Sequence, residues 1–194
     1  MRRNIHNKSG TKVADQFVVF RVTCLVMELL QTKRLKLRRF EASDANFILR
    51  LLNEPSFHRN IGDRKVRTTE DAVNYINARL LPSYSSNGYG LYMVEQSDGT
   101  PIGMCGLVKR DPNEDPDVGF AFIPETWQQG YAFEAATAVV EYAREVLKIK
   151  RILGITVPDN IASVKTLQKL GLQFLRKDVT KDTNEFICVY ELLL

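Results

Sequence analysis

The sequence predicts a single domain of the α/β or α+β class, in which one mixed β-sheet carries helices on both faces. Segments with the two-residue period of strands alternate along the chain with segments that have the 3.6-residue period of helices. Two pairs of strand-like segments are joined by short turns, SDGT at 97–100 and KDTN at 181–184, as in antiparallel hairpins. The length of 194 residues suits one domain with a substantial core.

Seven segments have the pattern of strands. LKLRRF at 35–40 alternates apolar and basic residues, as a half-buried strand does, whereas RILGITV at 151–157 predicts a buried strand. Asp98 and Gly99 form the expected turn pair of the first hairpin. The expected strands are, in chain order, 35–40, 89–96, 101–110, 117–123, 151–157, 172–179 and 185–194.

Four segments combine a helical period with a signal for a helix start. The expected helices begin at Ser43 and Asp44, at Thr68 or Thr69, at Gly130, and at Asn160. Pro82 is expected to end the second helix after about Leu81, because proline cannot continue it. The third runs to about Leu147, and Gly171 terminates the fourth.

The composition is that of a soluble globular protein, with 44% hydrophobic and 26% charged residues. A net charge of +4 mildly favours anionic ligands and is too small to indicate nucleic-acid binding. KRLKLRR at 33–39 raises an RNA-associated alternative, but its alternation fits the solvated face of one strand better. Cys24, Cys105 and Cys188 are scattered, which argues against a disulfide framework or a zinc site and favours a reducing compartment.

The first 26 residues differ from the rest of the chain. We expect 1–26 to be an appendage of uncertain structure and 27–194 to be the functional domain, with an extra strand at Phe17–Val22 as the alternative. The apolar run Phe17–Leu30 is interrupted by two charged residues and is shorter than the roughly 18 residues of a membrane span. Basic residues precede it, but no small-residue cleavage site follows, so the sequence predicts a cytoplasmic protein without a membrane anchor.

A short polar turn, PETWQQGYA at 124–132, connects an expected strand to the longest expected helix. The N–H groups of about 128–132 lack intrahelical partners, and the helix dipole adds partial positive charge, so this turn suits an anion. Gly130 would let the backbone approach a ligand. The alternative is a plain connection, with Gly130 in a left-handed conformation and Trp127 as packing. Neither GxxxxGK[ST] nor GxGxxG occurs, which argues against the nucleotide cradles that carry those motifs.

A second polar segment, PDNIASVKTLQKLG at 158–171, follows the buried strand at 151–157. Asn160 is suited to cap the next helix, and Ser163 lies in its first turn. Both side chains then lie at the C-terminal edge of the strand, where open α/β sheets bind ligands. Capping alone explains Asn160 fully and Ser163 less well.

These segments resemble the GNAT superfamily of acyltransferases, specifically the RimJ/RimL-like branch that acetylates N-terminal or other primary amines. TKRLKLRRFEASDA at 32–45 is similar to the family's first strand and helix. DVGFAFIPETWQQGYAFEA at 117–135 resembles its acetyl-CoA motif, and NIASVKTLQKLGLQF at 160–174 resembles a later segment. The resemblance covers about 30–194 and implies a mostly antiparallel central sheet of about seven strands.

The resemblance also implies the coenzyme contacts. The turn would offer backbone N–H groups to the pyrophosphate of coenzyme A, the preceding strand would pair with the pantetheine arm, Asn160 would bind pantetheine, and Ser163 would lie near the thioester sulfur. The implied contacts are Phe120, Ala121, Phe122, Gln128, Gln129, Gly130, Tyr131, Ala132, Asn160 and Ser163. Gln128 replaces a glycine that is usual in the family, and Leu167 stands where many members have a tyrosine acid.

Acyl transfer to an amine requires a neutral amine, a polarised carbonyl and a proton for the leaving thiolate. Asp117 occupies the position where relatives often carry glutamate and is the first candidate base; Glu114 and Asp115 are alternatives, and all three also suit a solvated loop. Ser163 is the candidate acid. We expect direct attack in a ternary complex, because Cys105 has no histidine beside it in the sequence.

The sequence therefore predicts an acetyl-CoA-dependent N-acetyltransferase that needs no metal, and the alternative is a non-catalytic acyl-CoA sensor of the same fold. A ribosomal-protein N-terminus, a polyamine, an amino acid and an antibiotic all remain open as acceptors, and a homodimer is open too. Residues considered for the acceptor side are His58, Arg59, Tyr84, Tyr89 and Tyr92, although each also suits a structural role.

Overall fold

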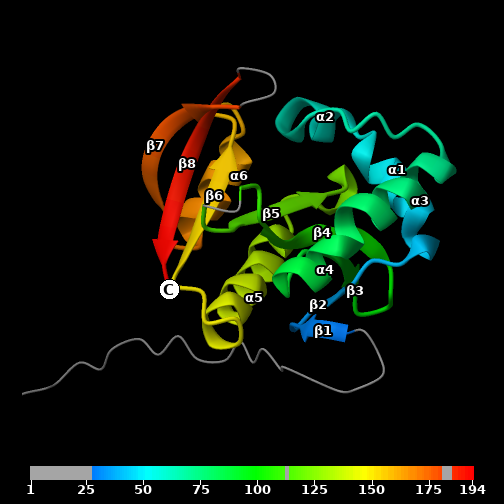
Figure 1. The fold of residues 1–194 in the computed structure, drawn as a ribbon, viewed down its shortest axis with the longest axis horizontal. Helices are drawn as coiled ribbons and strands as arrows, with labels where there is room; N and C mark the ends of the chain where they lie inside the picture. The colour runs from blue at the N-terminus through cyan, green and yellow to red at the C-terminus, as the bar shows by residue number, and fades with distance from the viewer. Residues whose placement is uncertain (1–27, 112–113, 181–184) are drawn as a thin grey trace, which may run out of the picture.

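The computed structural model describes residues 28–111, 114–180 and 185–194, and it confirms the predicted fold class. One sheet of eight strands has the order β1-β2-β3-β4-β5-β6-β8-β7, with helices on both faces (Figure 1). The strands are β1 Glu28–Gln31, β2 Leu35–Arg38, β3 Leu91–Gln96, β4 Pro101–Val108, β5 Asp117–Phe122, β6 Arg151–Thr156, β7 Gln173–Val179 and β8 Phe186–Leu193. The expected appendage, its alternative strand and the turn at 181–184 lie outside the described residues.

All seven predicted strands are present, and β1 is an additional strand at the edge of the sheet. β1 pairs antiparallel with β2, with an irregularity between Glu28 and Leu30. Four residues are too few to show a periodicity, so the pairing with β2 rather than a local sequence pattern defines this strand.

Six α-helices complete the described chain, together with three short helical turns. The α-helices are α1 Ala45–Leu52, α2 Pro55–Ile61, α3 Thr69–Tyr75, α4 Leu81–Asn87, α5 Tyr131–Glu145 and α6 Ile161–Lys169. The turns are the 3₁₀ turns Ala42–Asp44 and Pro124–Thr126 and the π-helical turn Ile76–Leu80. Thr68 caps α3 by accepting a hydrogen bond from the Asp71 N–H. The side chain of Asp44 makes no cap bond to α1, because its carboxylate instead binds the Arg38 guanidinium.

The prediction that Pro82 ends the second helix was wrong. α3 continues through the π-helical turn Ile76–Leu80 into α4, and Pro82 lies in the first turn of α4. A proline has no N–H to donate, and it is tolerated where an intrahelical donor is not required. The wider π-turn provides such a position, so the chain stays helical until Gly88, which adopts a left-handed φ of 77°.

The core consists of two apolar clusters, one on each face of the sheet, because successive side chains along a strand point to opposite faces. In β3, Tyr92 and Val94 belong to the cluster that contains α5 and α6, whereas Met93 belongs to the cluster that contains α1 and α3. This division places α5 and α6 on one face of the sheet and α1 and α3 on the other. All three of these β3 side chains are at most 2% exposed.

The sheet opens between β5 and β6, the only parallel pair of neighbouring strands among the described residues. These two strands pair only through Asp117 and Leu153, whereas β5 pairs with β4 along its whole length. In Figure 1, β6 and β8 run steeply while β5 runs across the view. Beyond Asp117, the edge of β5 that faces β6 therefore has no strand partner.

Candidate active site

A cleft of about 1350 Å³ lies at this opening of the sheet. β5 forms one wall, the end of β6 and the start of α6 form another, and α2 with the π-helical turn contributes a third. The cleft brings together all but one of the residues that the sequence assigned to the site. Those that line it are Asp117, Phe120, Ala121, Phe122, Gln128, Gly130, Tyr131, Ala132, Asn160 and Ser163, while Gln129 does not.

The turn between β5 and α5 has the geometry of an anion site. Gln128 and Gly130 both adopt left-handed backbone conformations, with φ of 61° and 81°. Within the described chain, no protein group accepts a hydrogen bond from the backbone N–H groups of 128–132. Trp127 fixes the start of the turn, because its Nε1–H donates to the Phe122 carbonyl at 2.9 Å. A row of unpaired donors therefore lies at the N-terminus of a 15-residue helix.

The free edge of β5 offers a second set of backbone groups. The Ile123 N–H donates to the Ile102 carbonyl on the β4 side. Because the hydrogen-bonding direction alternates along an antiparallel pair, Phe120 and Phe122 direct their backbone groups away from β4, toward the opening. An extended ligand that carries amide groups could pair with this edge as a neighbouring strand would.

The first turn of α6 faces β5 across the cleft. The side-chain oxygen Oδ1 of Asn160 accepts the Ser163 N–H at 3.2 Å and so caps the helix, which leaves the side-chain amide N–H groups of Asn160 available to a ligand. The Ser163 side chain is half-buried and has no hydrogen-bond partner among the described residues. Leu167 is 1% exposed and packs over Gly154, so the position at which the family resemblance implies a tyrosine acid in many members belongs to the core here.

Of the three candidate bases, only Asp117 lines the cleft. It is 2% exposed, and its carboxylate accepts hydrogen bonds from Arg110 Nε at 2.6 Å and Nη2 at 3.1 Å. Burial raises the pKa of Asp117, and the charge of Arg110 opposes this rise. Each carboxylate oxygen keeps a further lone pair. Asp115 instead pairs with Arg151 at 2.6 Å, and Glu114 approaches Arg176 at 3.8 Å, both outside the cleft.

Of the residues considered for the acceptor side, Arg59 lines the cleft, whereas the others occupy structural positions or lie outside it. Tyr84 and Tyr92 are buried and stacked, with ring centroids 5.4 Å apart. Tyr89 packs against the core cluster that contains α5, α6, Tyr84 and Tyr92. His58 lies outside the cleft, with its Nε2 atom 3.7 Å from Asp63 Oδ1. Cys105 is fully buried, and this burial raises the pKa of its thiol, so it does not form the thiolate that a nucleophile needs.

The cleft also contains residues that the sequence did not single out. Glu54 and Arg110 line it, and Arg34 bonds both to the Gln129 carbonyl in the turn at 128–132 and to Glu134. The sequence did contain a local signal for α2, the helix that begins directly after Glu54. Proline, here Pro55, is typical of the first position of a helix, and glycine, here Gly62, is typical of the position after the last. No local signal could link Arg34 to a turn about a hundred residues away.

The described residues contain no group of three or more His, Cys, Asp and Glu side chains that could hold a metal ion. Their helices include none that is long and apolar enough to cross a membrane.

Comparison with known proteins identifies relatives. A family model described as an acetyltransferase (GNAT) domain matches residues 34–173. The uncharacterised N-acetyltransferase p20 of Bacillus licheniformis is 30% identical over 170 residues, which cover 84% of this chain and 94% of that protein.

The solved structures that share the fold include two ribosomal-protein acetyltransferases. The ribosomal-protein-S5-alanine acetyltransferase of Vibrio fischeri has a TM-score of 0.71 at 18% identity, covering 84% of this chain and 94% of that one. RimL, a ribosomal L7/L12 α-N-protein acetyltransferase in complex with coenzyme A, has a TM-score of 0.71 at 16% identity, covering 84% and 95%. At these identities the likeness establishes the fold alone.

Proposed function

Because this chain belongs to the GNAT acetyltransferase family, we propose that it transfers the acetyl group of acetyl-CoA to a primary amine by direct attack in a ternary complex. The observation that carries the proposal is the row of unpaired N–H groups at 128–132, at the end of a strand whose free edge opens into a cleft. A plain connecting turn would not need two left-handed positions within three residues, one of them occupied by glutamine.

The coenzyme fits this arrangement in two parts. The pyrophosphate would accept hydrogen bonds from the N–H groups of the turn, where the dipole of α5 also favours negative charge. The pantetheine arm would pair with the edge of β5 at Phe120–Phe122 and receive a hydrogen bond from the Asn160 amide. This placement would bring the thioester to the part of the cleft between β5 and Ser163.

The chemistry then requires a proton acceptor and a proton donor. Asp117 would take a proton from the acceptor's ammonium group, directly or through water, so that the neutral amine attacks the thioester carbonyl. As the C–S bond breaks, the unpartnered hydroxyl of Ser163 would protonate the leaving thiolate. Because Cys105 is fully buried and burial raises the pKa of its thiol, we propose no acetyl-enzyme intermediate.

Calorimetry on the wild-type chain tests the coenzyme site. Acetyl-CoA is expected to bind with a measurable heat, and S-acetyl-pantetheine, which lacks the pyrophosphate, is expected to bind at least tenfold more weakly. A second assay follows amine-dependent release of the coenzyme thiol. Binding without any thiol release across a panel of amines would favour the alternative of an acyl-CoA sensor. Absence of acetyl-CoA binding would refute both functions.

A further inference from the structure

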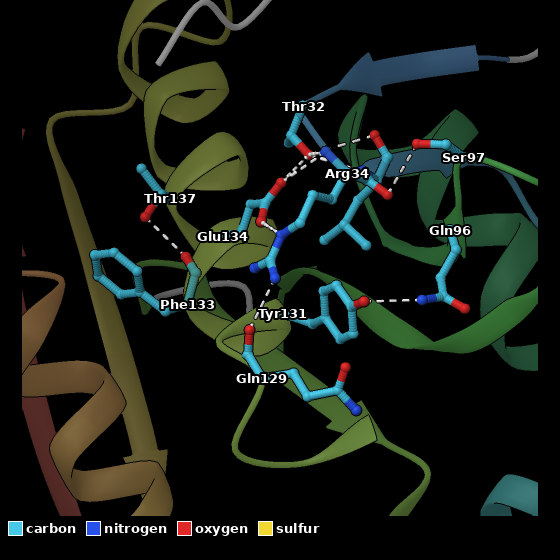
Figure 2. Close-up of polar contacts among 10 residues, drawn as sticks. Thr32, Arg34, Gln96, Ser97, Gln129, Tyr131, Phe133, Glu134 and Thr137 are labelled. Carbon is cyan, nitrogen blue, oxygen red and sulfur yellow. Dashed lines mark hydrogen bonds and ion pairs between the residues drawn. The ribbon is translucent and has the colours of Figure 1, made fainter. Parts of the chain in front are cut away.

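Arg34, which lies directly before β2, contacts the turn at 128–132 and does not line the cleft (Figure 2). Its Nη1–H donates to the Gln129 carbonyl at 3.0 Å, and its Nε–H donates to Glu134 Oε2 at 2.6 Å. The guanidinium also lies 4.4 Å from the ring centroid of Tyr131. One side chain thus contacts the turn and the first turn of α5 simultaneously.

The bond to Gln129 orients the next donor of the turn. In a trans peptide, the carbonyl of residue 129 and the N–H of Gly130 point in opposite directions. Because Arg34 holds the Gln129 oxygen on its own side, the Gly130 N–H must point away from Arg34. Gly130 lines the cleft, and its backbone could rotate freely without such an anchor.

The hydrogen bond between Arg34 and Glu134 compensates a negative charge beside the turn. A carboxylate in the first turn of a helix is favourable by itself, but it would repel a second anion at the same N-terminus. Glu134 accepts hydrogen bonds from Thr32 Oγ1, from the Arg34 backbone N–H and from the Arg34 guanidinium. Its side chain is only 12% exposed, so the Arg34 charge, rather than water, compensates it.

We propose that Arg34 is a positioning residue for coenzyme binding, which orients the Gln129–Gly130 peptide and neutralises Glu134. This inference rests on the proposed function, because it assigns Arg34 to the pyrophosphate part of that site. Lysine should not replace it, since a single ammonium lacks the planar fork that reaches Gln129 and Glu134 together.

The test compares Arg34→Gln, Arg34→Lys and Arg34→Gln/Glu134→Gln by calorimetry with acetyl-CoA and S-acetyl-pantetheine. Both single variants should lose about tenfold or more in acetyl-CoA affinity, the size expected for one or two hydrogen bonds to charged groups. Their affinity for S-acetyl-pantetheine should not change. The double variant should recover part of the loss, because it also removes the uncompensated Glu134 charge.

Arg151→Gln is the matched control, because Arg151 pairs with Asp115 and Glu191, is similarly exposed, and lies outside the cleft. It should bind both ligands as the wild type does. Unchanged acetyl-CoA binding by Arg34→Gln, or an equal loss for both ligands, would overturn the positioning role. Failure of the wild type to bind acetyl-CoA would instead overturn the proposed function.

A separate observation concerns the wall of the cleft that α2 and the π-helical turn form. Three arginines line it, Arg59 from α2, Arg64 from the following loop and Arg79 from the π-helical turn. None of them has a carboxylate within 4.0 Å among the described residues. Two other arginines of the same region do have carboxylate partners: Arg50 pairs with Glu54 and Glu125, and Arg67 pairs with Asp63.

Tyr75 lines the same wall as the three arginines, and burial raises the pKa of its hydroxyl. The charges of Arg64 and Arg79 both oppose that rise. Glu54 also lines the cleft, but its carboxylate pairs with Arg50. A wall with three arginines that have no carboxylate partner within the described chain favours an anionic ligand and repels a polycation.

We infer that the acceptor is an amine that also carries a negative group, such as an acidic peptide N-terminus, rather than a polyamine. The inference rests on the proposed function and narrows its acceptor class. A carboxylate on the acceptor could accept a bidentate hydrogen bond from either arginine.

The test measures kcat/KM for peptides of equal length with a free N-terminal amine, followed by either acidic or basic residues, and for spermidine. Acidic peptides should be preferred at least tenfold, and the preference should shrink as salt rises. The double variant Arg64→Gln/Arg79→Gln should raise KM for the acidic peptide. The control variant Arg67→Gln should not, because Arg67 already pairs with Asp63. Equal or better use of spermidine, or weaker acetyl-CoA binding by the double variant, would overturn the inference. A wild type that acetylates no amine would instead overturn the proposed function.

Discussion

Replacing Gly130 with valine is expected to lower acetyl-CoA affinity by at least tenfold. Gly130 has a φ of 81°, a conformation that costs an L-residue about 1–2 kcal/mol and is least accessible to a branched one. A Cβ there would lie 3.6 Å from Arg34 Nη2, so the added methyl groups would disturb the turn and its anchor. Losing even one hydrogen bond between a backbone N–H and a phosphate costs about 1.5–3 kcal/mol, which is a tenfold effect or more.

Gly99→Val provides the matched control for this loss. Gly99 has a φ of 87°, lies in the turn between β3 and β4 and has open space around its Cβ position. Both variants should therefore lose similar folding stability, measured by urea denaturation, but only Gly130→Val should lose coenzyme binding. Equal coenzyme binding by the two variants would show that the 128–132 turn does not hold the pyrophosphate.

The parts of the site that could be predicted from the sequence are those that local chemistry determines. Gly130 marks a left-handed position before a helix, and Asn160 marks an N-cap, whatever the rest of the chain does. Both occur directly after strong strand patterns, so the two halves of the cleft could be recognised separately. Their meeting across β5 and β6 followed from the family resemblance rather than from either segment.

The parts that could not be predicted depend on the tertiary structure. The ion pair between Arg34 and Glu134 joins residues a hundred positions apart, and it forms because β2 passes close to the start of α5. Pro82 was misread for a related reason. The rule that proline ends a helix assumes regular i to i−4 bonding, and a π-helical turn before Pro82 removes that assumption.

Asp117→Asn is expected to lower kcat by about 10²–10⁴-fold, the usual contribution of a general base, with little change in acetyl-CoA affinity. Asparagine preserves the shape of the side chain but cannot accept the proton of an ammonium. Arg110 would lose its partner, but its side chain is 49% exposed, so water can solvate the unpaired charge and the fold should persist. Steady-state kinetics and calorimetry with acetyl-CoA together separate these two effects.

The pH dependence provides a second readout, and its direction follows from the burial of Asp117. Burial raises the pKa of this carboxyl, and a base works only when deprotonated, so activity should fall with decreasing pH at a higher pH than for an ordinary carboxyl. In the folded state the group also binds its proton more tightly than in the unfolded chain. Its contribution to folding stability should therefore decline as the pH rises from about 3.9, the unfolded value, through the raised folded value.

Arg110→Gln distinguishes a catalytic Asp117 from a purely structural ion pair. The Arg110 charge lowers the pKa of Asp117, so its removal should raise that pKa further and move the acid limb of the pH–rate profile to higher pH. In Asp117→Asn the limb should disappear, whereas Glu114→Gln and Asp115→Asn should retain it, because both residues lie outside the cleft. A folded Asp117→Asn variant with wild-type kcat and an unchanged acid limb would transfer the role of base to another group, and the other carboxylates that line the cleft are Glu54, Asp159 and Glu185.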